Sequence, residues 1–165
     1  IPVDNRLGKE GEGYKLALQI LDSSRIMIAA QCLGLANGAL TAALSYSKSR
    51  ITFGKPIASR QAIQFSIADM ATELDAARLL TYRAAALYDE GLPHGKESAM
   101  AKLYASEAAG RIASKSLQIH GGVGYFKPSA VERIYRDQRV TEIYEGTSEI
   151  QRLVISRALI TDLIE

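Results

Sequence analysis

The sequence predicts an all-α fold, an antiparallel four-helix-type bundle with long helices plus one short helix. Three long stretches rich in Ala, Leu, Lys, Arg and Glu lie between clusters of proline and glycine, the residues that end helices. Apolar residues in these stretches recur every three or four positions, which is the spacing of one helix face. Strand signals are poor, because no alternating apolar and polar run persists between turns.

The first predicted helix runs from about residue 13 to residue 49. Its apolar positions include Leu16, Ile20, Ile28, Leu35 and Leu44. A helix of this length would measure roughly 54 Å, so we expect its faces to pack on other domains or subunits as well. Gly34 and Gly38 are four residues apart and predict a close-packing patch against a neighbour.

Two further long helices are separated by the loop around Pro93, and two shorter ones follow Pro128. The predicted core faces of the long helices are Ile63, Ile67, Met70, Leu74, Ala77, Thr81, Ala84 and Tyr88, then Met100, Leu103, Tyr104, Ala108 and Ile112. Each shorter helix begins with a capping-box pattern, Ser129 with Glu132 and Ser148 with Gln151.

Composition narrows the class of protein. The 165 residues suit a single domain, and 20 basic against 18 acidic residues give a net charge of +2, too even to indicate nucleic-acid binding. Cys32 is the single cysteine, which excludes an internal disulfide, and with two histidines it does not favour a metal site. No apolar run approaches the roughly 20 residues of a membrane helix. The chain opens at Ile1, so we expect a fragment of a longer protein.

Four motifs contain residues that a plain bundle does not need. They are Asp22–Arg25, Arg50–Ile57 with Gln61, Gln118–Tyr125, and Tyr144–Glu149. Each also has an ordinary structural explanation: an intrahelical ion pair, a cation at a helix C-terminus, a flexible connection, and a solvated glutamate beside a helix start. Individually they leave the function open.

In order and spacing, these motifs resemble the C-terminal domain of the acyl-CoA dehydrogenases. The matching pieces are Asp22–Arg25, Arg50-x-x-Phe53-Gly54-x-Pro56, Gln61, Gln118-Ile119-His120-Gly121-Gly122-x-Gly124-Tyr125, Arg133–Asp137 and Tyr144–Ser148. The resemblance implies that residues 1–165 form this helical domain, with an N-terminal helical domain and a middle β domain absent. It also implies a homo-oligomer, a dimer or tetramer.

The resemblance assigns a role to each motif. Glu145 would be the base that removes the α-proton of an acyl-CoA, while a hydride leaves the β-carbon for FAD and gives a trans-2-enoyl-CoA. FAD would be bound by Arg50, Phe53, Gln61, Thr147 and Glu149, and by Gln118, Ile119, Gly121 and Gly122 from a neighbouring subunit. The acyl-CoA would be contacted by Asp22, Arg25, Tyr144 and Gly146.

One position separates branches of this family. Some members place the base immediately before the position of Arg25, where this chain has Ser24. Because Glu145 is present instead, the short-, medium- or short/branched-chain type is favoured. The resemblance further implies electron-transferring flavoprotein as redox partner and an intracellular setting, bacterial cytoplasm or mitochondrial matrix. The alternatives are a non-catalytic oligomerisation module and an acyl-CoA oxidase or flavin monooxygenase on the same fold, and the isolated fragment is expected to be inactive.

Overall fold

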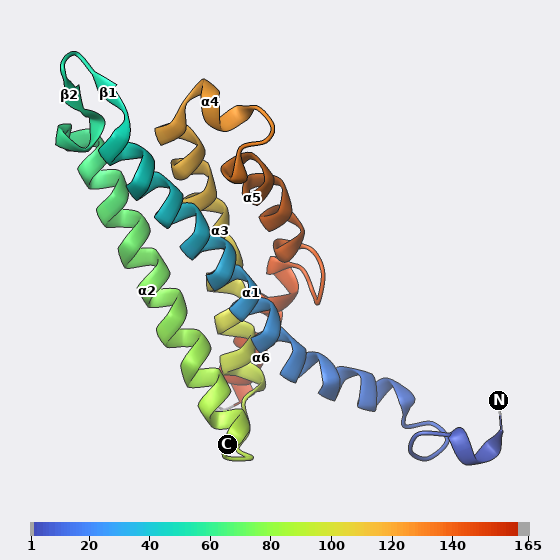
Figure 1. Cartoon of the computed structure of the whole chain (residues 1–165). Helices are drawn as coiled ribbons and strands as arrows, with labels where there is room; N and C mark the ends of the chain where they lie inside the picture. Colours follow the sequence, from blue (N-terminus) through green and yellow to red (C-terminus); the bar gives the residue numbers. More distant parts are fainter. Residues whose placement is uncertain (1, 162–165) are drawn as a thin grey trace.

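The computed structural model describes residues 2–161 and is helical almost throughout, which confirms the all-α prediction (Figure 1). The three long helices are α1 (Gly13–Ser49), α2 (Gln61–Asp89) and α3 (Gly95–His120), and the two shorter ones are α5 (Ala130–Arg139) and α6 (Ser148–Thr161). The single turn α4 (Gly122–Tyr125) and the 3₁₀ segments η1 (Val3–Asn5), η2 (Ile57–Ser59) and η3 (Val140–Glu142) complete the helical elements. The sequence predicted a plain loop before α2. The structure has a two-stranded antiparallel hairpin there, β1 (Ile51–Thr52) with β2 (Lys55–Pro56), in which Ile51 pairs with Pro56.

The helix α3 is the centre of the bundle, because it packs against α1, α2, α5 and α6. Small residues dominate its buried positions, which lets the neighbouring helices approach closely. The buried apolar residues of α3 are Ala99, Ala101, Ala105, Ala108, Ala109, Ile112, Ala113 and Ile119. Of the predicted core positions, Ala108 and Ile112 are buried, whereas Met100, Leu103 and Tyr104 are only partly so. In α2 the prediction holds from Met70 to Ala84.

The core face of α1 differs from the predicted one. The buried residues of this helix are Arg25, Ala29, Cys32, Ala36, Ala39, Leu40, Ala43 and Ser47, all with the spacing of one helix face. Of the larger apolar residues chosen from the sequence, Ile28 and Leu44 are partly buried and pack against the core, whereas Ile20 is 67% exposed. Close packing of α1 on α3 selects small side chains, so size rather than hydropathy marks the inner face here.

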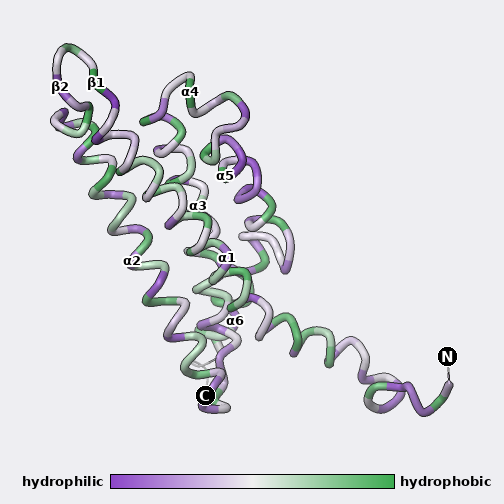
Figure 2. Tube along the Cα trace, viewed as in Figure 1, coloured by the Kyte–Doolittle hydropathy of each residue, from purple (hydrophilic) through white to green (hydrophobic). Residues whose placement is uncertain are grey.

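The first turns of α1 extend beyond the other helices as an arm (Figure 1), which we define as residues 13–27. Apolar side chains lie exposed along it, including Tyr14, Leu18 and Met27, and green segments mark it in Figure 2. Contrary to the sequence-based expectation, α1 is long and apolar enough to cross a membrane by length and composition. Core helices of soluble proteins share those two properties, and the inner face of α1 packs on α3, so they do not by themselves indicate a span.

Both predicted capping boxes are wrong in detail. The Ser129 side chain makes no capping hydrogen bond to α5. At α6 the capping hydroxyl belongs to Thr147, which accepts a hydrogen bond from the Ile150 N–H at 3.5 Å, while the Ser148 hydroxyl is buried. Of the two glycines in α1, Gly38 lies against Ile134 of α5. Gly34 has no neighbour within 4 Å of an added Cβ among the described residues.

Candidate active site

The turn between η3 and α6 carries Glu145 in a left-handed backbone conformation, with φ of 56°. Gly146 follows with φ of 91°, so two successive residues turn the chain sharply into α6. The Glu145 side chain points to α1, where the Ser24 hydroxyl donates a hydrogen bond to its Oε2 at 2.5 Å. The turn therefore aims a carboxylate at the first long helix.

Two buried side chains hold the peptide carbonyls of this turn. Gln151 Nε2 donates to the Glu145 carbonyl at 3.1 Å and to the Gly146 carbonyl at 2.8 Å. Lys102 Nζ, from α3, donates to the Gly146 carbonyl at 2.8 Å. Burial lowers the pKa of the Lys102 ammonium below its ordinary value. Sequence analysis named Gln151 only as a capping-box partner of Ser148. It did not single out Lys102, although Lys102 lies in phase with Ala99, Ala105 and Ala109 on α3, a register that predicts burial.

The other residues assigned to the acyl-CoA lie close to this turn in the chain or in space. Arg25 is buried and donates to Asp22 at 2.7 Å, so the predicted ion pair forms. Its Nε is buried without a hydrogen-bond partner. The Tyr144 hydroxyl donates to the Gln31 side chain at 2.6 Å. Burial raises the pKa of Tyr144, and the hydrogen bond to Gln31 opposes that rise.

An apolar groove of about 640 Å³ begins at Ser24 and continues along the arm. Its other lining residues come from the chain start, α1 and the end of α2: Leu7, Gly8, Leu16, Gln19, Ile20, Ser23, Met27 and Tyr88. Ser24, which lines the groove, also donates the hydrogen bond to Glu145, although Glu145 itself is not a lining residue.

A second cavity of about 550 Å³ lies at the opposite end of α1. It is lined by Tyr46, Arg50, Thr52, Ile57, Ile119, His120, Gly121, Gly122, Val123 and Phe126. Four of the residues predicted to bind a cofactor meet here: Arg50, Ile119, Gly121 and Gly122. A guanidinium beside glycine backbone suits a phosphate-bearing ligand. The imidazole of His120 stacks on Tyr46 at 4.4 Å between ring centroids and closes one wall.

Several residues assigned to the cofactor lie elsewhere. Phe53 is 96% exposed at the hairpin tip, with φ of 48°, and the Arg60 guanidinium lies 5.7 Å from its ring centre. Gln61 and Gln118 are exposed and do not line the second cavity. Thr147 and Glu149 lie at the Glu145 end of the molecule. The pKa of Glu149 is lowered by hydrogen bonds that its carboxylate accepts from the Glu149 backbone N–H and from the Thr147 hydroxyl.

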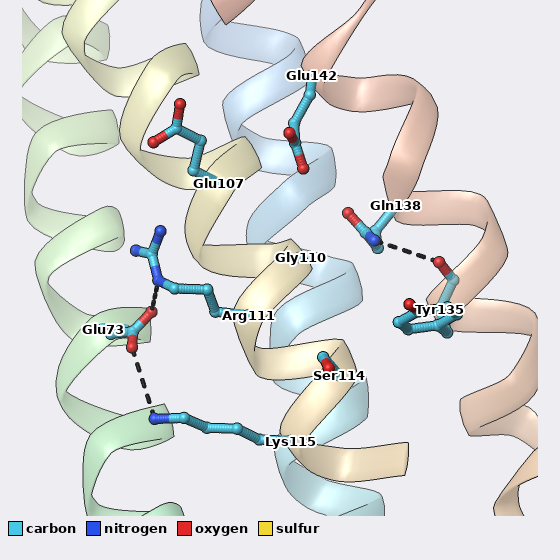
Figure 3. Close-up of a pocket in the computed structure, with 9 residues that line it drawn as sticks. All are labelled: Glu73, Glu107, Gly110, Arg111, Ser114, Lys115, Tyr135, Gln138 and Glu142. Carbon is cyan, nitrogen blue, oxygen red and sulfur yellow. Dashed lines mark hydrogen bonds and ion pairs between the residues drawn. The ribbon is translucent and has the colours of Figure 1, made fainter. Parts of the chain in front are cut away.

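A third hollow lies between α2, α3 and the α5–η3 segment (Figure 3). Its charged groups are largely paired within the chain: Glu73 accepts from Arg111 at 2.7 Å, and Lys115 lies 3.8 Å from the same carboxylate. Glu142 pairs with Arg139 at 2.7 Å. Tyr135, from the Arg133–Asp137 motif, lines this hollow, but none of the residues assigned to the cofactor or the acyl-CoA does, so the hollow is separate from the candidate site.

The fold and the site define a class: a helical-bundle domain that presents a carboxylate beside an apolar groove, with a phosphate-suited cavity about 40 Å away along one helix. The chain belongs to the acyl-CoA dehydrogenase family, since residues 11–160 match the family described as "Acyl-CoA dehydrogenase, C-terminal domain".

Known relatives agree with this assignment. The chain is 56% identical over 160 residues to the mitochondrial short-chain specific acyl-CoA dehydrogenase of Bos taurus, covering 97% of this chain and 39% of the relative. It is 55% identical over 157 residues to acryloyl-CoA reductase (NADH) of Anaerotignum propionicum, a match that covers 95% of this chain and 40% of the relative. Among solved structures, acyl-CoA dehydrogenase complexed with FAD from Bacillus anthracis matches with a TM-score of 0.94 and 30% identity. This match covers 99% of this chain and 31% of the solved chain. The chain thus spans about two fifths of the length of these curated relatives.

Proposed function

We propose that the protein carrying this chain is an FAD-dependent acyl-CoA dehydrogenase for short, medium or branched acyl-CoA, with Glu145 as the base that removes the α-proton. The observation that supports the proposal is the hydrogen bond of 2.5 Å from Ser24 to Glu145, because Ser24 also lines the apolar groove. An acyl chain in the groove would present its α-carbon to this carboxylate, as general base catalysis requires.

The groups around Glu145 suit a thioester. The Ser24 hydroxyl would hold the carboxylate in place until substrate arrives, and the Asp22–Arg25 ion pair supplies polar groups on the same helix as Ser24. The turn lies directly before the start of α6, and backbone N–H groups at a helix start can stabilise the negative charge that develops on a carbonyl oxygen. Tyr144 and Gly146 flank the base and shape the turn.

The second cavity fits a cofactor with phosphate groups. Arg50 supplies a cation, and at Gly121 and Gly122 an added Cβ would find open space, so a ligand can approach the backbone closely. We infer that Arg50, Ile119, Gly121 and Gly122 hold the nucleotide part of FAD. When bound, this cofactor supplies the acceptor for the hydride that leaves the β-carbon of the substrate.

The distance between the two sites supports a homo-oligomer. Ser24 and Arg50 are separated by about 40 Å of helix, which is longer than an extended FAD. One cofactor therefore cannot reach both sites of a single chain, and we propose that each subunit completes a neighbour's cofactor site, in a dimer or tetramer. The exposed apolar residues of the arm are available for contacts with further domains or subunits.

The remaining assignments follow from the resemblance. We propose an N-terminal helical domain and a middle β domain in the complete protein, electron-transferring flavoprotein as its redox partner, and a mitochondrial or bacterial intracellular location. The similarity to a reductase favours one further possibility, namely that the physiological direction is reduction of an enoyl-CoA. The same base would then return a proton to the α-carbon.

The experiment is anaerobic mixing of the complete protein with a four-carbon acyl-CoA, followed by flavin absorbance. Replacing Glu145 with Gln removes the base but keeps its shape, so we expect the bleaching rate to fall roughly 10²–10⁴-fold. Glu107→Gln is the matched control, since this carboxylate pairs with Arg152 of α6 and lies outside the groove. Unchanged bleaching in Glu145→Gln would exclude this residue as the base.

A further inference from the structure

Lys102 is a buried cation in an unusual setting. Its side chain is fully inaccessible on α3, and it takes no part in the ion pairs found among residues 2–161. Lysine is almost never fully buried without a charged partner, because losing water disfavours the ammonium. The hydrogen bond that it makes instead goes to a peptide carbonyl, that of Gly146, at 2.8 Å.

The turn that receives this hydrogen bond is itself strained. A non-glycine residue with positive φ, as at Glu145, persists only where its surroundings hold it. Two donors do so, because Gln151 binds the carbonyls of Glu145 and Gly146 while Lys102 binds the second of these from the opposite helix. Gln151 belongs to α6, next to the turn, whereas Lys102 belongs to α3 at the centre of the bundle.

We propose that Lys102 is a positioning residue for Glu145: its ammonium ties the Gly146 carbonyl to the central helix and so fixes the direction of the Glu145 side chain toward the groove. This inference rests on the proposed role of Glu145 as the base. The bond crosses from α3 to the turn, so it sets where the turn lies relative to α1, which carries Ser24 and the groove.

If Lys102 served only to stabilise the fold, its substitution would slow the reaction only as far as it lowered stability. Methionine has a similar length and no charge, so Lys102→Met removes the cost of burying a cation. The Gly146 carbonyl keeps the hydrogen bond from Gln151 and is not left without a donor. Stability should therefore be kept or increased, while the carboxylate loses its fixed position. Small displacements of a reacting group are costly to rate.

The test uses the complete protein with bound FAD and a four-carbon acyl-CoA as probe. For Lys102→Met we expect the limiting rate of flavin bleaching to fall at least about tenfold. The acyl-CoA concentration for half-saturation should stay within about threefold, and the melting temperature should be equal or higher. Lys115→Met is the matched control on the same helix, since Lys115 bonds to Asp69 of α2, and it should keep the wild-type rate.

A limiting rate for Lys102→Met within threefold of wild type would overturn the proposal, as would a loss of rate that follows a loss of melting temperature. If the methionine variant does not fold, Lys102→Gln, a shorter neutral donor, is measured in the same way, with the same outcomes counting for and against. Glu145→Gln separates this inference from the proposed function. A wild-type rate in Glu145→Gln would refute the proposed role of Glu145 as the base. A slow Glu145→Gln together with a wild-type rate in Lys102→Met would refute only the proposed role of Lys102.

Discussion

The two ends of α1 are built differently. Near Ser24, the Glu145 turn is fixed by hydrogen bonds from side chains of α1, α3 and α6. Near Arg50, the second cavity has a guanidinium at an exposed helix end, with Phe53 extended into solvent. One end is held by side chains from several helices of this chain, whereas at the other end Arg50 and Phe53 are exposed.

This difference separates two needs of the proposed reaction. A base must be held to within a fraction of an ångström, so its supports lie in the same folded unit. A nucleotide can be bound by groups from more than one chain, provided that the oligomer brings them together. We therefore expect substitutions at the Glu145 end to lower the rate of flavin bleaching, and substitutions at the Arg50 end to weaken cofactor retention.

The largest effect is expected for Gly146→Ala. Its φ of 91° disfavours any Cβ, and the added atom would lie 2.8 Å from Gln151 Nε2 and 3.3 Å from Ile150 Cγ2. We expect a loss of about 2–4 kcal/mol in the free energy of unfolding, measured by urea denaturation, together with slower flavin bleaching.

Gly91→Ala is its control, because this glycine has φ of 69° and no neighbour within 4 Å of an added Cβ. It should show backbone strain alone, about 1–2 kcal/mol. Equal losses in the two variants would mean that the Gly146 turn is not tightly packed.

Arg50→Ala tests the open end. The side chain is exposed, so the unfolding free energy should change little, whereas loss of a charge-assisted hydrogen bond should weaken FAD binding by about 1.5–3 kcal/mol. Titration of the apoprotein with FAD measures this directly. Lys48→Ala removes a cation two residues earlier that does not line the second cavity, and it should keep the wild-type affinity. Parallel weakening in both variants would point to general charge attraction.

The smallest of the three effects is expected for Gly124→Ala, beside the wall of the second cavity. The added Cβ would lie 2.6 Å from His120 Cβ and 3.1 Å from Val131 Cγ2. Overpacking here should cost about 1–3 kcal/mol of unfolding free energy. The same change at Gly34, where no neighbour lies within 4 Å, should instead stabilise the helix by about 0.5–1 kcal/mol. A stable Gly124→Ala would show that this wall is loose.

Sequence patterns predicted the helices well, because proline and glycine mark their ends and periodicity marks their faces. They were less reliable where size mattered as well as hydropathy, as in α1, where four alanines and only one leucine, Leu40, are buried. Glu145 was found through its motif. Lys102 was missed because a lysine is ordinarily assigned to solvent, and only the packing of four helices around α3 shows that it is enclosed.

The arm has a practical consequence for anyone who handles this chain. Side chains such as Ile20 and Met27, which are 67% and 70% exposed, give the arm an apolar surface that faces water. Preparations of residues 1–165 alone should self-associate through the arm, and mild detergent should dissociate these assemblies. Light scattering with and without detergent would therefore measure how much of the self-association depends on the apolar surface of the arm.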